Sequence, residues 1–203
     1  LLWSGLLIAT ADAGDALAAG GFALLLAVAA TLATGAGAPA SGWRRILPLV
    51  AGTTELALLI ALTGFGAEAW GLYLLLSAAT IVLAWREPRL VPAVAASLLL
   101  SAVALAGSVR PGPVGVPVAA AIGLILLFGG AGHALARREA DGSWWAAIGA
   151  AGLVVPFVTL GSGRPDLLPE PGWSAAALLL ALPPLHLAWR SQNAACPTSP
   201  FDR

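Results

Sequence analysis

Charge is scarce in this chain, and two residue types are missing altogether. Only 10% of the 203 residues are charged and 59% are apolar, whereas a soluble domain is usually about 25% charged. Lysine and methionine are absent, so every basic residue is an arginine. An aqueous fold does not hide that much apolar surface, and the composition therefore favours an integral membrane protein.

Several functional classes lack their sequence signals. The single cysteine, Cys196, lies in a polar tail and cannot form an internal disulfide. Net charge is zero and the arginines are dispersed, whereas nucleic-acid binding needs a clustered basic face. The chain has no nucleotide-binding glycine loop, no Gly-x-Ser-x-Gly motif and no paired-carboxylate motif. We therefore expect no nucleic-acid partner and no cofactor, and catalysis is not indicated.

The apolar residues fall into runs of membrane-spanning length, about 20 residues, bounded by charge, proline and glycine. Such runs indicate helices, because a membrane β-strand would show about ten residues of alternating character. The sequence predicts an all-α fold, a polytopic transmembrane helical bundle over residues 1–190 with about eight crossings, followed by a polar tail over 191–203. The predicted segments are Leu1–Ala11, Ala16–Gly35, Ile46–Phe65, Ala69–Trp85, Leu90–Ser108, Val114–Ala136, Trp144–Leu160 and Trp173–Trp189.

The first of these segments is too short to cross a membrane. Leu1–Ala11 has about half the required length, and residue 1 is not methionine. A signal peptide is not indicated, because no basic region and no clear cleavage site precede the next segment. We expect the first helix to be incomplete and the chain to be part of a longer protein.

The arginines and tryptophans predict an orientation. With eight crossings, eight of the ten arginines fall on one side, and the positive-inside rule makes that side cytoplasmic, together with the C-terminus. All tryptophans fall at or near predicted helix ends, where the indole prefers the headgroup level. The arginines of this side are Arg44, Arg45, Arg86, Arg89, Arg137, Arg138, Arg190 and Arg203. This predicts a multi-pass protein of a bacterial inner membrane, with the lipid bilayer as its main partner.

A faint internal repeat divides the helical region into two four-helix halves, 1–89 and 90–190. The segment from Trp70 to Arg86 resembles the segment from Trp173 to Arg190, with matching Leu-Leu-Leu and Leu-Ala-Trp-Arg elements. An even number of crossings would make the halves parallel, an arrangement known in transporters. Chance matches between Ala/Leu-rich segments are the alternative.

Glu55 and two histidines are the candidate functional residues. Glu55 lies near the middle of the third predicted helix, where a carboxylate is costly and suggests a proton- or cation-coupling site. A protonated acid bonded to a neighbouring helix is the alternative. His133 and His186 lie toward the cytoplasmic ends of their helices and could relay protons with Glu55, or could be interfacial polar residues. Their spacing does not indicate a metal site.

A group of glycines and a pair of charged residues are further features of the sequence. Gly129, Gly130 and Gly132 would let another helix approach closely. Arg164 and Asp166, in the Pro-rich loop over 161–172, are the notable charges of the external side and could contribute to a ligand site.

The loop style resembles that of a known family. Arginine-containing turns such as Trp85–Arg89, and Ala136–Arg138 followed by Ser143–Trp145, join short Ala/Leu-rich helices. This texture is similar to that of very large polytopic bacterial membrane proteins known as domain of unknown function 2339. The resemblance implies a protein with many more crossings, and it supplies no established substrate or catalytic residue.

The leading functional hypothesis is a transport or envelope-associated membrane component, which could also contact further helices of its own chain or form a homo-oligomer. The alternatives are a membrane-embedded enzyme acting on lipid-linked substrates and a structural scaffold for partner subunits.

Overall fold

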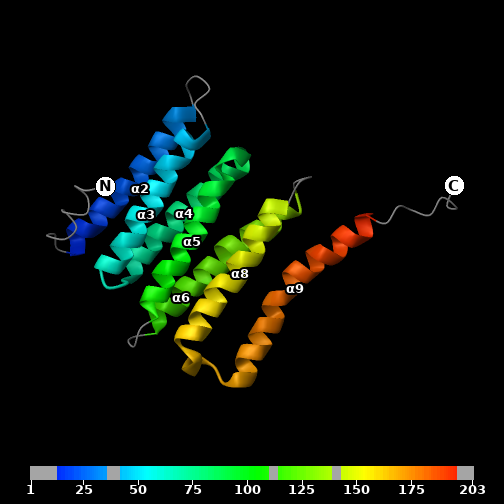
Figure 1. The fold of residues 1–203 in the computed structure, drawn as a ribbon. Coiled ribbons are helices and arrows are strands. Elements are labelled where there is room, and N and C mark those ends of the chain that lie inside the picture. The colour runs from blue at the N-terminus through cyan, green and yellow to red at the C-terminus, as the bar shows by residue number, and fades with distance from the viewer. Residues whose placement is uncertain (1–12, 36–41, 110–113, 139–142, 196–203) are drawn as a thin grey trace, which may run out of the picture.

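The computed structural model of the protein describes residues 13–35, 42–109, 114–138 and 143–195, and within these ranges it is all-helical (Figure 1). The prediction of an all-α bundle is confirmed for this part of the chain. Its helices are α2 (Ala13–Gly35), α3 (Gly42–Leu62), α4 (Ala67–Arg86), η1 (Pro88–Leu90), α5 (Val91–Ser108), α6 (Gly115–Leu124), the π-helical segment η2 (Ile125–Gly130), α7 (Ala131–Ala136), α8 (Ser143–Gly163), η3 (Pro165–Leu167) and α9 (Glu170–Ala195).

Six helices of the described residues are long and apolar enough to cross a membrane. They correspond to the third to eighth predicted crossings, with α6, η2 and α7 forming one continuous helix over Gly115–Ala136. The second predicted crossing is α2, whose apolar part, Ala18–Ala33, is shorter. The first, Leu1–Ala11, lies outside the described residues, so the count of eight stays a prediction.

Prolines occupy a helix start and helix interiors. Pro92 occupies the first turn of α5, where the missing amide proton costs nothing. Pro48 lies inside α3, which begins at Gly42. Pro183 and Pro184 lie inside α9, and Figure 1 shows this helix changing direction along its length, as expected for prolines in a helix interior.

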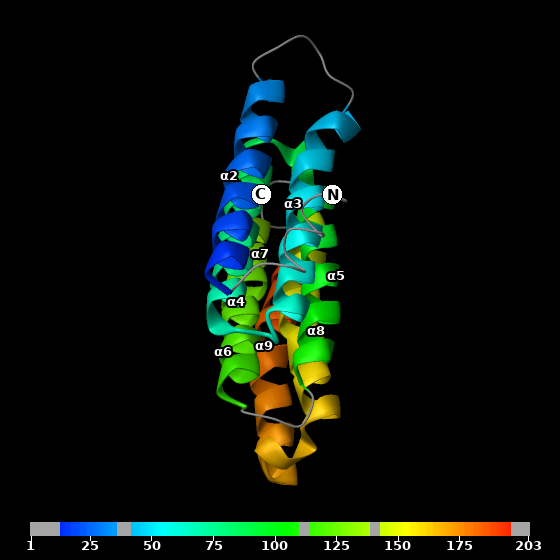
Figure 2. The same ribbon diagram turned by 90° about the vertical axis from the view of Figure 1, so that its left-hand side faces the viewer.

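Successive helices run in opposite directions and sort into two layers (Figure 2). Helices α2, α4 and α6–α7 run one way and form one layer, while α3, α5 and α8 run the other way and form the second. Neighbours within each layer pack together, as α3 does with α5 and α5 with α8. Helix α9 lies at the edge of the bundle, against α8.

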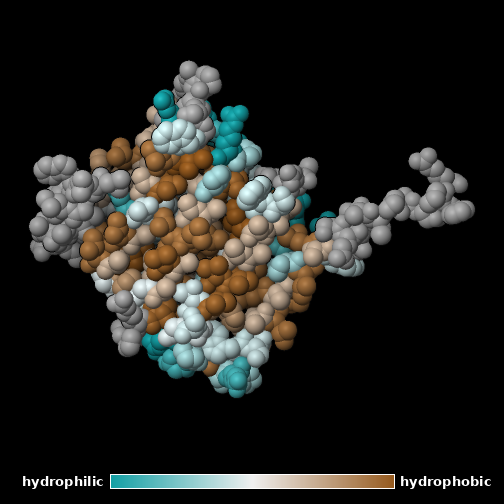
Figure 3. Space-filling view, in the orientation of Figure 1, coloured by the Kyte–Doolittle hydropathy of each residue, from teal (hydrophilic) through white to brown (hydrophobic). Residues whose placement is uncertain are grey.

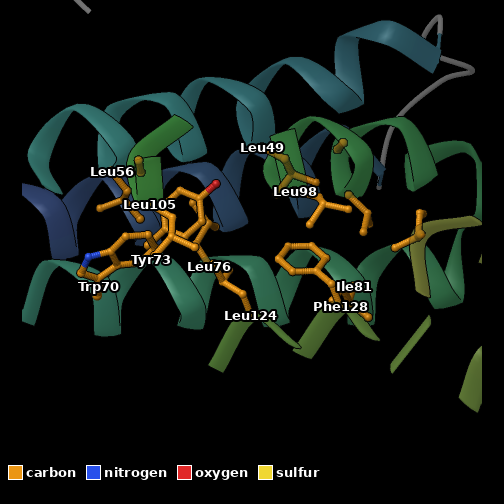
Figure 4. Packing of buried hydrophobic residues seen from close by; sticks show 14 of the residues in the cluster. Leu49, Leu56, Trp70, Tyr73, Leu76, Ile81, Leu98, Leu105, Leu124 and Phe128 are labelled. Carbon is orange, nitrogen blue, oxygen red and sulfur yellow. The ribbon is translucent and has the colours of Figure 1, made fainter. Parts of the chain in front are cut away.

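The core lies between the two layers and is mostly aliphatic. Leu56 of α3, Tyr73 of α4, Leu105 of α5 and Phe128 of η2 are fully buried there. Figure 4 shows Leu56, Tyr73 and Leu105 close together and Phe128 farther along the bundle. Because lipid is as apolar as leucine, tight packing and hydrogen bonds between helices hold such a core together.

Polar contacts inside the core join α4 to α5. The Tyr73 hydroxyl donates to the backbone carbonyl oxygen of Ser97 at 2.5 Å, and the hydroxyls of Ser77 and Ser97 lie 2.8 Å apart. All three residues are fully buried. In contrast, the Ser101 hydroxyl donates within its own helix, to the carbonyl of Leu98. Sequence reasoning did not single out this pairing, because each residue alone resembles any other small polar residue in a membrane helix.

We expect Ser97→Ala to destabilise the fold measurably. The change removes the hydroxyl partner of Ser77 across α4 and α5, and bonds of this kind in membrane proteins contribute about 0.6 kcal/mol on average and about 1.7 kcal/mol at most. Ser101→Ala is the matched control on the same helix, with an expected effect near zero because no other helix loses a partner. Unfolding by denaturing detergent measures both; equal losses would contradict the assignment.

The outer surface is as apolar as the interior. Leu25, Leu99, Val103, Leu126 and Leu178 are each at least 67% exposed, and Figure 3 shows a broad hydrophobic band with hydrophilic residues gathered toward its two ends. A soluble monomer rarely exposes contiguous apolar patches larger than a few hundred Å². The surface is therefore that of a protein whose middle contacts lipid.

Seven arginines lie at one end of the bundle, which we call the arginine end. An ion pair between Arg45 and Glu87 joins the start of α3 to the turn after α4 at 2.5 Å. Because successive helices alternate in direction, the other arginine-containing turns reach the same end. The arginine end comprises Arg44, Arg45, Arg86, Arg89, Arg137, Arg138 and Arg190. The predicted grouping of these arginines is confirmed, whereas Arg203 lies outside the described residues.

Six of the described tryptophans fall into two groups that the sequence did not separate. Trp43, Trp85, Trp144 and Trp189 are 47–69% exposed at the arginine end, as expected of residues at headgroup level. Trp70 and Trp145, although each lies in the first turn of its helix, are 2% exposed and belong to the core.

Helix α9 differs from α4, its counterpart in the predicted repeat. Helix α4 packs against α2, α3, α5 and α6, whereas no residue of the Glu170–Arg190 span of α9 is buried. The two halves therefore place matching sequences in different environments, and the duplication stays a prediction. Helix α9 also continues to Ala195, so the first part of the predicted tail, 191–195, is helical.

Candidate functional site

Glu55 lies halfway along α3, inside the Trp43–Leu62 span, and is half-buried. Thr53 and Leu56, near it on the same helix, are fully buried. The threonine hydroxyls before it donate to carbonyls of their own helix, Thr53 to Leu49 at 3.0 Å and Thr54 to Val50 at 2.7 Å. The carboxyl group therefore sits at the boundary between the packed interior and the surface of the bundle.

The two histidines lie at the arginine end, on neighbouring helices. His133 is on α7, one turn before Arg137, and His186 is on α9. The Arg137 guanidinium, at its Nη2, lies 3.5 Å from Nδ1 of His186. The structure thus brings His133, Arg137 and His186 together.

Glu55 is not part of this group. Helix α3 packs mainly against α2, α4 and α5, and Figure 1 shows α5 and α8 between α3 and α9. A direct proton relay from Glu55 to the histidines is therefore not assembled in this structure. Within the described residues, no group of three His, Cys, Asp or Glu side chains could hold a metal ion.

A pocket of about 320 Å³ opens beside His133, between α7, α8 and α9. The π-helical segment η2 supplies much of its wall, through residues such as Gly129 and Gly130. Short π-helical segments within α-helices are frequent at functional sites. Sequence reasoning did not predict η2; the adjacent glycines 129 and 130 in a long helical run were the available signal. The lining residues are Ile125, Leu126, Gly129, Gly130, His133, Ala134, Arg137, Leu153 and Pro183.

The predicted close approach at the glycines is confirmed at two of three positions. A Cβ atom on Gly132 would lie 2.6 Å from the backbone nitrogen and Cα of Gly149 on α8, and one on Gly129 would collide with Leu153. A Cβ atom on Gly130 would meet nothing within 4 Å, because this residue faces the pocket. Gly129 and Gly132 are thus covered by α8 of the same chain, which leaves them unavailable to a partner subunit.

The charges of the opposite end form a local pair. The Arg164 guanidinium donates to both carboxylate oxygens of Asp166, at 3.0 and 2.9 Å. These hydrogen bonds hold the pKa of the Asp166 carboxyl below its usual value. The nearby indole of Trp173 donates to the carbonyl of Pro165 at 3.1 Å and packs edge-on against Phe157. The predicted external loop is therefore anchored to α8 and α9.

Comparisons with known proteins add no relative: no protein-family model, no curated protein and no solved structure matches this chain. The resemblance to the large polytopic family stays a prediction. The long apolar helices and the lipid-like surface are those of an integral, multi-pass membrane protein.

Proposed function

We propose that this chain is a transport or envelope-associated component of a bacterial inner membrane, with its arginine end in the cytoplasm and Glu55 as a coupling residue. The orientation follows from the positive-inside rule, because seven arginines lie at one end and Arg164 lies at the other.

Glu55 is the observation that supports a transport role. An ionisable side chain within a membrane span costs about 2.5–3.5 kcal/mol when it is charged at the helix centre. Ionisable residues are rare in membrane spans, and those that occur mark substrate or ion pathways and proton relays. The half-buried side chain lies at the edge of the packed interior, where it contacts protein and is not fully exposed to lipid.

Replacing Glu55 with glutamine should remove proton movement. We expect vesicles that contain the purified protein and a pH-sensitive dye to equilibrate an imposed pH gradient, and Glu55→Gln to return the rate to that of protein-free vesicles. Glutamine keeps the size and polarity of the side chain but cannot release a proton.

Glu68→Gln is the matched control, because Glu68 is exposed in the first turn of α4. This variant should equilibrate the gradient as the unaltered protein does. An unchanged rate in Glu55→Gln would exclude the coupling role, and no rate above background in the unaltered protein would exclude proton-coupled transport by this chain alone.

A further inference from the structure

Helix α9 packs on α8, and two adjoining pockets lie beside it, which we together call the α9 crevice. It consists of the 320 Å³ pocket at the arginine end and a second pocket of about 420 Å³ toward the other end. Both pockets are lined by Ile125 of η2, and Leu180 and Pro183 of α9, which line one pocket each, are three positions apart, so the two pockets adjoin. Each is within the size range of ligand sites, about 300–1,000 Å³.

The two parts of the α9 crevice differ in chemistry. The second pocket is lined by apolar residues of α6, α8 and α9, from Val118 and Phe157 to Trp173 and Leu179. The first pocket has His133 and Arg137 on its wall, and His186 lies against Arg137. Neither pocket is lined by an acidic residue among those the structure describes.

One polar atom in the first pocket lacks a partner. Nε2 of His133 is buried from solvent and forms no hydrogen bond within the described part of the chain. A buried polar group without a partner is costly, about 1–3 kcal/mol, and a ligand oxygen in the pocket would satisfy it once the imidazole turned toward the pocket that its residue lines. The site therefore places the Arg137 cation and two imidazoles at one end of an apolar crevice.

The depth of these groups matches that of lipid headgroups. His186 lies one turn before Trp189, and Trp189 and Trp144 are 62% and 69% exposed at this end, where indoles mark the headgroup level. Arg137 and Ile125 are twelve positions apart on one helix, which at 1.5 Å per residue is roughly 18 Å toward the membrane centre.

We propose that the α9 crevice binds an anionic phospholipid, with its phosphate at Arg137, His186 and His133 and its acyl chains extending past Ile125 toward Trp173. Arginine forms charge-assisted hydrogen bonds with phosphate oxygens, and basic pockets between membrane helices on the cytoplasmic side bind lipid headgroups. The lipid fills the space beside an α9 that is otherwise packed mainly on α8. The inference goes beyond the proposed transport role and needs only that the chain crosses a bilayer.

Native mass spectrometry of the full chain, with phosphatidylglycerol and phosphatidylcholine added at equal amounts, tests the proposal. We expect retained phosphatidylglycerol to exceed phosphatidylcholine. Arg137→Gln should lower phosphatidylglycerol affinity about five- to tenfold, since one basic residue near a lipid headgroup contributes about 1 kcal/mol or more. Arg138→Gln, at the adjacent arginine that does not line the pocket, should leave the affinity unchanged.

A second variant tests the crevice itself. Gly130→Leu places a side chain in the pocket at a position where a Cβ meets no atom within 4 Å, so it should block lipid retention while the unfolding temperature is kept. Equal retention of the two lipids, equal losses in Arg137→Gln and Arg138→Gln, or full retention in Gly130→Leu would overturn the proposal. Displacement of phosphatidylglycerol by inorganic phosphate would also overturn it, in favour of a soluble phosphorylated ligand.

Discussion

Replacing Gly132 with alanine should cost the protein much of its stability. The new methyl group would lie 2.6 Å from the backbone nitrogen and Cα of Gly149 and 2.9 Å from the carbonyl oxygen of Trp145. All three are backbone atoms of α8. Rotating a side chain therefore cannot relieve the clash, and the two helices must separate. Overpacking a core costs about 1–3 kcal/mol and occasionally more, and we expect the upper end here. Total stabilities are only about 5–15 kcal/mol.

Two other glycines separate this clash from general effects of adding a methyl group. Gly130→Ala has open space and should stabilise the protein by about 0.4–1 kcal/mol, because alanine restricts the unfolded chain. Gly20→Ala would meet Leu59 Cδ2 at 2.5 Å, but that atom is the end of a flexible side chain, so the cost should be smaller than at Gly132. Thermal unfolding in detergent ranks the three; a loss at Gly132 no larger than that at Gly20 would contradict the backbone contact.

Cysteine labelling should give an all-or-none difference between the two ends of α8. Ser143 and Ser162 are both exposed and lie at opposite ends of this helix, whose 21 residues at 1.5 Å each span roughly 30 Å, the thickness of the hydrocarbon core. In a Cys196→Ser background, Ser162→Cys should react in intact cells with a maleimide that cannot cross membranes. Ser143→Cys should react only after permeabilisation, because it follows the Arg137–Arg138 turn.

The labelling pattern decides whether α8 crosses the membrane and which end of the bundle faces the cytoplasm. Reaction at both positions in intact cells would show that α8 does not span the membrane, and the reverse pattern would place the arginine end outside. The effect is large because a charged turn crosses the hydrocarbon core only at a cost of several kcal/mol per residue, so a mixed population is not expected.

The sequence by itself determined the membrane class, the helices and their alternation. Apolar runs of spanning length leave helices as the structure that satisfies its own backbone in lipid, and the position of each run sets which turns share an end. The ion pair of Arg45 with Glu87 and the contact of Arg137 with His186 agree with the end assigned from the arginine count. These features depend on the local composition of each run and on the number of runs that precede a turn, and both can be read from the sequence.

Tertiary structure alone decided which faces meet. Nothing in the sequence distinguishes Trp145, which is buried, from its neighbour Trp144, which is exposed, because leucine-rich helix faces are equally suited to lipid and to protein. The same ambiguity concealed the pairing of Ser77 with Ser97, the π-helical segment η2 and the α9 crevice. In a soluble protein, apolar residues are the buried ones, so burial leaves a periodic pattern in the sequence. In a bilayer, the contacts between helices depend on the shape of their surfaces and on a few hydrogen bonds. These contacts are visible only in the folded chain.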